Sequence, residues 1–230
     1  MAVRMRSRCV WRCRLSGVAA LALLLLLTAS GFAAETAGTH RVPIPGTGLS
    51  LAVPASVRVA KEAPNDPKQP TLAVVVEDIR RLPAEAPVGR ADVLAQRKAL
   101  ARGKLMVADE VGEESLARLV ALPVGANAAV YPDFSDFEVC DLRLELRAVF
   151  FIGEKRVTLV YYAPPRVVIR ENPAYFGRDK ANCGTATVWK NPGPDLFRRF
   201  YANAAKGALG PAGNAWYADF MTMLASLRRD

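Results

Sequence analysis

Residues 139–163 carry the clearest pattern of hydrophobic and polar positions in the chain. From 142 to 150, apolar side chains alternate with Arg and Glu, so that every second residue shares one face. This period of two is typical of a β-strand with one buried face. A second β-branched run follows at 156–163, after turn residues at 153–155 and before Pro164 and Pro165. The pattern predicts a long antiparallel hairpin that ends at these prolines.

Shorter strands are expected nearer the start of the chain. Residues 48–54 alternate between apolar and small or polar side chains, residues 56–60 continue in the same way, and residues 71–76 are a β-branched run. These segments fit strands of a half-buried sheet. The proline-rich stretch 63–70 separates two of them and is expected to be a loop within the domain.

Helical spacing is strongest near the end of the chain. After Asn214, a favourable N-cap, apolar residues recur at 216, 220, 223, 224 and 227, which predicts an amphipathic helix. Weaker helical patterns lie at 91–105, 113–122 and 196–205.

Strands arranged mainly as hairpins, with helices between and after them, predict an α+β domain. We expect a predominantly antiparallel sheet with helices packed on its faces and an amphipathic C-terminal helix. A doubly wound parallel sheet is the alternative. It would need strict alternation of strands and helices, which residues 139–163 break.

Residues 1–34 are expected to be a secretory signal peptide and not part of the fold. Residues 1–17 are rich in arginine without an acid, residues 18–29 are apolar, and small residues follow near 33. The apolar run is about half of the roughly 20 residues that a spanning helix needs, which disfavours an uncleaved anchor. Residues 35–230 are therefore expected to form one periplasmic or secreted domain without an integral membrane segment.

The net charge does not indicate a nucleic-acid partner. The chain has 31 Lys and Arg against 22 Asp and Glu, a formal net charge of +9. Much of the excess comes from arginines of the predicted leader, and the remaining surplus contains no long basic block. We therefore expect no binding of nucleic acid.

Two cysteines remain after the predicted leader, Cys140 and Cys183. An even pair in an exported chain predicts a structural disulfide, for which the chain-entropy model gives about 4 kcal/mol of stabilisation. The alternative is a redox or nucleophilic thiol. The chain lacks the C-x-x-C spacing and a nearby histidine that would activate such a thiol.

Most common catalytic and cofactor sites lack their residues. His40 is the one histidine, so a nucleophile and histidine arrangement would have to use it, and zinc or copper would lack ligands. Glycine-rich nucleotide motifs and the G-x-S-x-G elbow are absent from the sequence. We therefore expect no metal and no cofactor.

One carboxylate cluster deserves a hypothesis of its own. Four acidic residues crowd one short stretch. If it is extended, Asp136 and Glu138 would share a face, which could bring two carboxylates together for calcium binding or for acid and base catalysis. The alternative is a solvated loop that leads into a strand. The residues are Asp133, Asp136, Glu138 and Asp141.

Aromatic and basic residues gather in residues 164–213, which we expect to be rich in loops. An aromatic and arginine surface is typical of protein-binding hot spots, although half of these rings could instead belong to the core. The candidate partner-binding residues are Tyr175, Phe176, Trp189, Arg198 and Arg199.

The order of elements resembles a known superfamily. The strand-like residues 48–54 and 71–78, the helix from Ala91, the long hairpin and the closing stretch 220–228 resemble the PsbP/Mog-like α/β/α-sandwich superfamily. It contains PsbP, the extrinsic subunit of photosystem II, the Mog-type Ran-binding proteins and many exported bacterial proteins. Residues 164–213 depart from this pattern. The resemblance implies a partner-binding or accessory domain more often than an enzyme.

These observations favour a non-catalytic exported domain that binds a protein partner in the cell envelope. One alternative is an immunity or inhibitor protein that neutralises an exported toxin, because a small exported domain with a disulfide fits that role equally well. A second alternative is a hydrolase or lyase that uses the carboxylate cluster.

Overall fold

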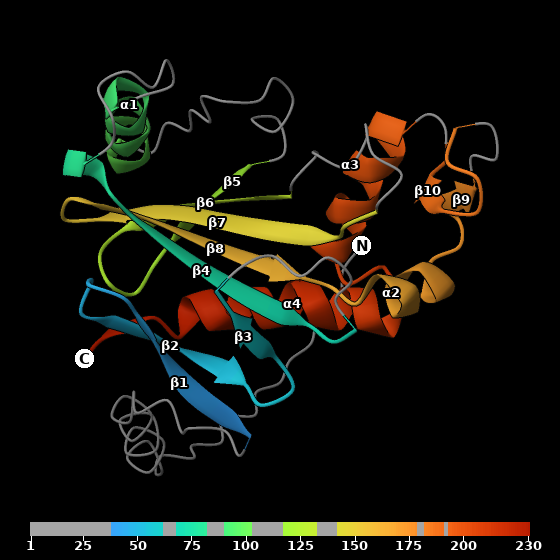
Figure 1. Ribbon diagram of the computed structural model, residues 1–230, viewed down its shortest axis with the longest axis horizontal. Coiled ribbons are helices and arrows are strands. Elements are labelled where there is room, and N and C mark those ends of the chain that lie inside the picture. Colours follow the sequence, from blue (N-terminus) through green and yellow to red (C-terminus); the bar gives the residue numbers. More distant parts are fainter. Residues whose placement is uncertain are drawn as a thin grey trace, which may run out of the picture. The chain divides into compact units, whose positions relative to one another are not determined.

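A six-stranded β-sheet organises the fold (Figure 1). We describe it from a computed structural model that covers residues 38–61, 68–81, 90–102, 117–132, 142–178, 182–190 and 193–230. Its strands, in spatial order, are β3 (Arg58–Ala60), β4 (Thr71–Asp78), β8 (Lys155–Tyr162), β7 (Glu145–Ile152), β6 (Asn127–Pro132) and β5 (Arg118–Ala121). Neighbouring strands are antiparallel except β3 and β4, which run parallel. The α+β prediction is therefore confirmed.

The predicted long hairpin is formed by β7 and β8. Its register pairs Ile152 with Lys155, and Gly153 makes the turn with a φ of 58°, a conformation that suits glycine. Pro164 and Pro165 follow the second strand, as predicted. The first strand begins at Glu145, later than the pattern suggested, and residues 139–141 lie outside the described part of the chain.

A second sheet joins segments from the two ends of the described chain. Its order is β1, β2, β11, and the two-residue strand β11 pairs with β2 through Arg228 and Ser50. A third sheet is the short hairpin of β9 and β10. The strand bounds are β1 (Thr39–Ile44), β2 (Leu49–Pro54), β9 (Phe176–Arg178), β10 (Thr187–Trp189) and β11 (Arg228–Arg229).

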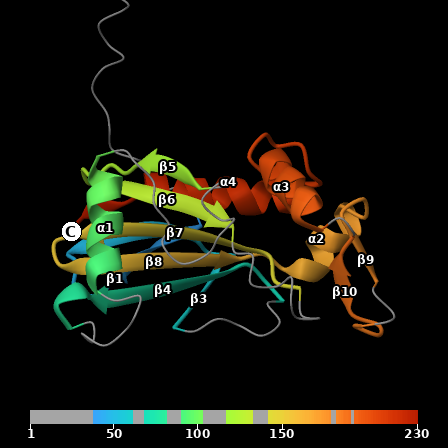
Figure 2. The same ribbon diagram turned by 90° about the horizontal axis from the view of Figure 1, so that it is seen from above.

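Helices lie on both sides of the six-stranded sheet. Figure 1 shows α1 and α4 on opposite sides of it, and both views show α2, α3, β9 and β10 together at one end (Figure 2). No helix within the described ranges has the length and apolar character needed to cross a membrane. The helices are η1 (Ile79–Arg81), α1 (Arg90–Ala101), α2 (Pro165–Glu171), α3 (Gly193–Ala204) and α4 (Pro211–Ala225).

The main core lies between α4 and one face of the sheet. Trp216 and Phe220 of α4 are both 1% exposed or less. Phe220 stacks on Tyr161 of β8 with 5.7 Å between ring centroids, and the indole Nε1 of Trp216 donates to the backbone oxygen of Tyr161 at 3.1 Å. The same continuous core includes Leu49 and Leu51 of β2. The helix and both larger sheets therefore share one hydrophobic interior.

Two predicted elements need correction. The helix expected at 113–122 is wrong for its last residues, because Arg118–Ala121 form strand β5, paired with β6. Leu119 and Val120 fit either pattern over so short a segment, and the pairing with β6 decides it. Residues 164–213 are not mainly loop, because they contain α2, β9, β10 and α3.

Helix α4 begins earlier than its sequence suggested. It starts at Pro211, whose fixed φ suits the first helical position, and Gly210 is the N-cap. Asn214 lies inside the helix. Its side chain accepts a hydrogen bond from the backbone N–H of Leu209 and donates to the oxygens of Gly207 and Leu209. It therefore fastens the preceding turn and does not cap the helix.

Candidate functional site

An aromatic cluster fills the end of the fold formed by α2, α3, β9 and β10. Phe176 and Trp189 face each other across β9 and β10, with ring centroids 4.7 Å apart. Phe200 meets both rings edge-on, at 5.5 Å from Phe176 and 5.3 Å from Trp189. Such pairs contribute stability beyond their buried area. We call Phe176, Trp189, Phe197, Phe200 and Tyr201 the aromatic cluster.

Local spacing in α3 explains how the sequence builds this cluster. Phe197, Phe200 and Tyr201 are three and four residues apart, which places their rings on one face of the helix. The ring of Tyr201 lies 5.8 Å from that of Trp216 in α4. The cluster is therefore continuous with the main core.

The burial of these rings corrects the predicted partner-binding surface. Phe176 is 5% exposed and Trp189 is 8% exposed, so neither ring can serve as a contact residue without rearrangement. Tyr175 is half-buried, and its hydroxyl accepts a hydrogen bond from the side-chain amide of Asn203 at 2.6 Å. The rings turned inward because the segment folds into helices and strands that bring them together.

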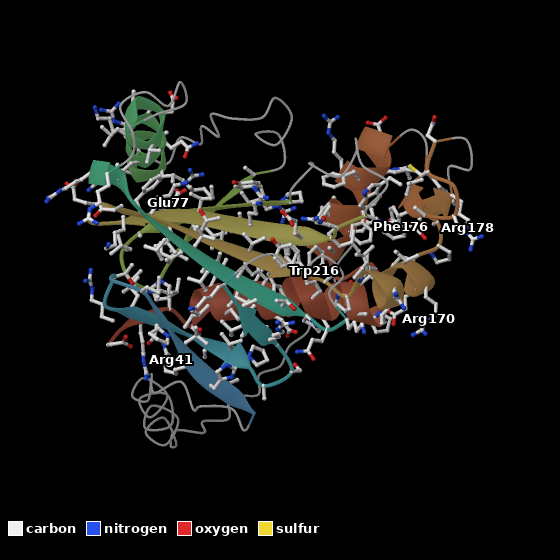
Figure 3. The ribbon with its side chains drawn as sticks, viewed as in Figure 1. Arg41, Glu77, Arg170, Phe176, Arg178 and Trp216 are labelled. Carbon is white, nitrogen blue, oxygen red and sulfur yellow. The ribbon has the colours of Figure 1, made fainter. Side chains whose placement is uncertain are left out.

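The cations predicted for this surface are exposed. Arg198 and Arg199 are both at the surface of α3, and Arg170 and Arg178 project outward from α2 and β9 (Figure 3). Among the described residues from 165 to 206, the acids are Glu171 and Asp195. We call the following exposed residues the basic end: Arg166, Arg170, Arg178, Lys190, Arg198, Arg199 and Lys206.

The charges of the basic end are only partly neutralised. Asp195 forms a long ion pair with Arg198, at 3.8 Å, with both side chains largely exposed. Exposed pairs of this kind contribute little and compete weakly with a partner. The Nζ of Lys190 donates to the backbone oxygen of Pro173 at 2.8 Å, which positions the ammonium without cancelling its charge. The arrangement can therefore attract carboxylates.

A cavity of about 290 Å³ lies between α3, α4 and the β5 edge of the large sheet. Tyr201 and Ala202 of α3 and Tyr217 of α4 form its helical wall. Val130, Pro132 and Leu146 come from the facing strands, and the remaining lining residues are Ala117, Arg118 and Tyr131. Sequence reasoning missed this cavity, because its walls come from five separate segments.

An ion pair on β7 with a buried carboxylate was also missed. The alternation of residues 142–150 placed Glu145 and Arg147 on the polar face of a strand, yet the Glu145 side chain is 3% exposed. Arg147 donates to its Oε1 from Nη2 at 2.8 Å and from Nε at 2.9 Å. A buried carboxylate held in this way is well suited to a structural role, because the guanidinium of Arg147, whose side chain is 35% exposed, offsets the cost of burying the charge of Glu145.

Several predicted residues lie outside the described part of the chain. The whole carboxylate cluster, Asp133, Asp136, Glu138 and Asp141, is among them, as is Cys140. Cys183 lies in the turn before β10, and its pairing with Cys140 stays a prediction. His40 is exposed on β1. Within the described ranges, no three His, Cys, Asp or Glu residues are grouped to hold a metal ion.

Comparison with known proteins adds no family to this picture. No protein-family model matches the chain, and no curated protein has a significantly similar sequence. The resemblance to the PsbP/Mog-like superfamily therefore stays a prediction that rests on the order of elements.

Proposed function

We propose that this chain is a non-catalytic exported domain whose basic end binds an acidic protein partner in the cell envelope. The observation that carries the proposal is the set of exposed arginines around a buried aromatic cluster. Export follows from the predicted signal peptide at residues 1–34. The finer fold prediction, helices packed on the sheet and an amphipathic C-terminal helix, supplies the scaffold.

The aromatic cluster holds the backbone that carries the basic end in one conformation. Ring contacts of Phe197 with Trp189, at 5.1 Å, and with Tyr201, at 4.6 Å, fix the buried face of α3. Arg198 follows directly on the exposed side of the same helix. A backbone held in place loses less conformational entropy on binding, so more of the interaction energy appears as affinity.

The chemistry of arginine favours carboxylates as the partner groups. The guanidinium is planar and always charged, and its N–H groups match both oxygens of a carboxylate. Arg198 and Arg199 are adjacent at the surface of α3. They suit an acidic stretch of polypeptide better than a single acidic side chain.

The same surface suits a membrane or a nucleic acid less well. The large exposed hydrophobic residues of the described ranges are Val59, Val75 and Leu119, and none belongs to the basic end. Insertion into lipid would need such residues there. Stacking on bases would need exposed rings, and the rings of the cluster are buried.

The disulfide between Cys140 and Cys183 is part of the proposal. Cys183 is in the turn before β10, so a bridge there would fasten the β9 and β10 hairpin to the chain that precedes β7. An immunity or inhibitor protein is a special case of the same binding role, with an acidic toxin as the partner. The hydrolase or lyase alternative depends on carboxylates outside the described residues.

Capture from an envelope extract of the source cell, under oxidising conditions, tests the binding role. The wild-type protein is compared with Arg198→Glu/Arg199→Glu and with the matched control Arg228→Glu/Arg229→Glu, which reverses two adjacent exposed arginines on β11. We expect an acidic protein to be retained by the wild type and the control, to be lost from the α3 variant, and to elute as salt rises.

Three results would count against this proposal. Equal capture by the α3 variant and the control would remove the basic end from the interface, and capture insensitive to salt would remove its electrostatic basis. If the captured material is phospholipid or nucleic acid and contains no acidic protein, the partner is not a protein and the proposed partner class is wrong. Mass measurement of the exported protein tests the predicted cleavage and the predicted disulfide. We expect an N-terminus near residue 35 and a mass lower by two hydrogens than that of the dithiol form.

A further inference from the structure

The cavity between α3, α4 and β5 has the dimensions of a site for a small molecule. Its volume of about 290 Å³ is near the lower end of ligand pockets, which are roughly 300–1,000 Å³. Since each water in the liquid has about 30 Å³, the space corresponds to about ten waters. A ligand of about ten non-hydrogen atoms matches this volume.

Among the described residues that line the cavity, Arg118 is the charged one. It pairs with Val130 in the register of β5 and β6, and side chains directly opposite each other in antiparallel strands share a face. Val130 belongs to the core on the α4 face of the sheet. Arg118 therefore lies on the cavity side of β5, where it is exposed, and it forms no side-chain hydrogen bond or ion pair with another residue of the described ranges.

The remaining walls are apolar or aromatic. Val130, Pro132 and Leu146 form the sheet side, and Tyr201 and Tyr217 contribute from the helices. The hydroxyl of Tyr201 donates to the backbone oxygen of Glu145 at 3.3 Å, which holds its ring in place. As far as the described residues go, the site thus combines a rigid apolar wall with the guanidinium of Arg118, which they leave unpaired.

We propose that this cavity binds a small organic anion with an apolar or aromatic body, whose carboxylate pairs with Arg118. The body would displace water from the apolar wall, and the guanidinium would fix the orientation through charge-assisted hydrogen bonds. The cavity and the basic end use different side chains of α3. Tyr201 and Ala202 line the cavity, and neither Arg198 nor Arg199 is among its lining residues.

Titration with 3-phenylpropanoate, followed by two-dimensional NMR of the ¹⁵N-labelled protein, tests the proposal. The probe has a phenyl body and one carboxylate, and 3-phenylpropanamide is its uncharged counterpart. We expect saturable shifts at the residues that line the cavity and a dissociation constant about tenfold lower for the acid than for the amide, the effect of one charge-assisted contact.

Two variants separate the charge from the space. Arg118→Gln is expected to weaken binding of the acid about tenfold and to leave the amide unchanged. Arg58→Gln, an exposed arginine on the opposite edge strand β3, is the matched control and is expected to change neither. Ala202→Leu fills the cavity and is expected to abolish binding of both probes. Unchanged backbone spectra outside the cavity show that each variant is folded.

The proposal is overturned if the acid and the amide bind equally, if the shifts map to other residues, or if Arg58→Gln weakens binding as much as Arg118→Gln. Absence of saturable shifts at millimolar probe overturns it as well. None of these results bears on protein capture by the basic end, so the two proposals fail independently.

Discussion

The carboxylate of Glu171 accepts a hydrogen bond from the backbone N–H of Ala212 at 2.7 Å and so closes the first turn of α4. Helix α4 has no capping side chain of its own, because its N-cap is Gly210. The neighbouring Asn172 completes the junction, with its Oδ1 accepting from the backbone N–H of Gly210 at 2.9 Å. The last residues of α2 thus cap the helix that carries much of the core.

Removing this cap is expected to destabilise the fold. Glu171→Ala loses the hydrogen bond and the negative charge at a helix N-terminus, together about 1 kcal/mol of unfolding free energy. Glu171→Gln keeps an acceptor of the same length and is expected to lose less. Urea denaturation of the three proteins checks this order. Equal stability of the Ala and Gln variants would show that the contact contributes nothing specific.

Close packing at the same junction gives a second variant. A Cβ on Gly210 would lie 2.6 Å from the Cβ of Glu171, so Gly210→Ala must push α2 and α4 apart. We expect a loss of about 1–3 kcal/mol, as for other overpacked sites. Gly207→Ala is no substitute control, because Gly207 has a φ of 67° and is strained by any side chain.

The half-buried carboxyl of Asp219 predicts a pH dependence of stability. Burial raises the pKa of Asp219 above its ordinary value. The folded protein therefore binds this proton more tightly than the unfolded chain does. The stabilisation that comes from this tighter proton binding is present at low pH and is lost as pH rises through the pKa of Asp219 in the folded protein.

The variant Asp219→Asn tests this sign, because the amide cannot ionise. Relative to wild type, it is expected to gain stability between acidic and neutral pH and to be the more stable protein at pH 7. Denaturation at a series of pH values measures the difference. A gap between the two proteins that stays constant with pH would contradict the prediction.

Arg41 ties the β1 and β2 hairpin to the end of α4 (Figure 3). Its Nη2 donates to the backbone oxygens of Ser50 at 2.8 Å and Ser226 at 3.1 Å, and its Nε donates to Ser50 Oγ at 3.0 Å. Ser226 is the C-cap of α4, where a cation also interacts favourably with the helix dipole.

A lysine cannot replace this fork of donors. Arg41→Lys keeps the charge but not the planar geometry, so we expect a loss of about 1 kcal/mol, and slightly more for Arg41→Ala. Thermal and urea unfolding report the change, with Arg58→Lys as the exposed control. If lysine restores full stability, the charge alone matters and the hydrogen-bond geometry does not.

Elements set by neighbouring residues could be predicted from the sequence. The β7 and β8 hairpin depends on a period of two and on a glycine turn, both of which are local. The strand β5 could not be separated from a helix, because a four-residue segment fits either period and only its pairing with β6 decides. Glu171 could not be identified as a cap, because the helix it closes begins 40 positions later along the chain.

The sequence predicted which residues gather at the candidate site but not which of their side chains point to the surface. The arginines of the basic end are exposed, as expected from their charge. Phe176 and Trp189 turn inward because the short hairpin and α3 meet there, a contact no local pattern encodes. Glu145 is buried on a strand face that the alternation assigned to solvent, since covering that face depends on how other segments pack.

The contact between Tyr201 and Trp216 affects how the protein unfolds. Because the aromatic cluster is continuous with the α4 core, the basic end cannot unfold alone without exposing rings that stabilise the sheet. Trp189 lies in the cluster and Trp216 in the main core, so their fluorescence would change together at one denaturant concentration. The basic end, which we assign to recognition, is therefore expected to have the same free energy of unfolding as the main core.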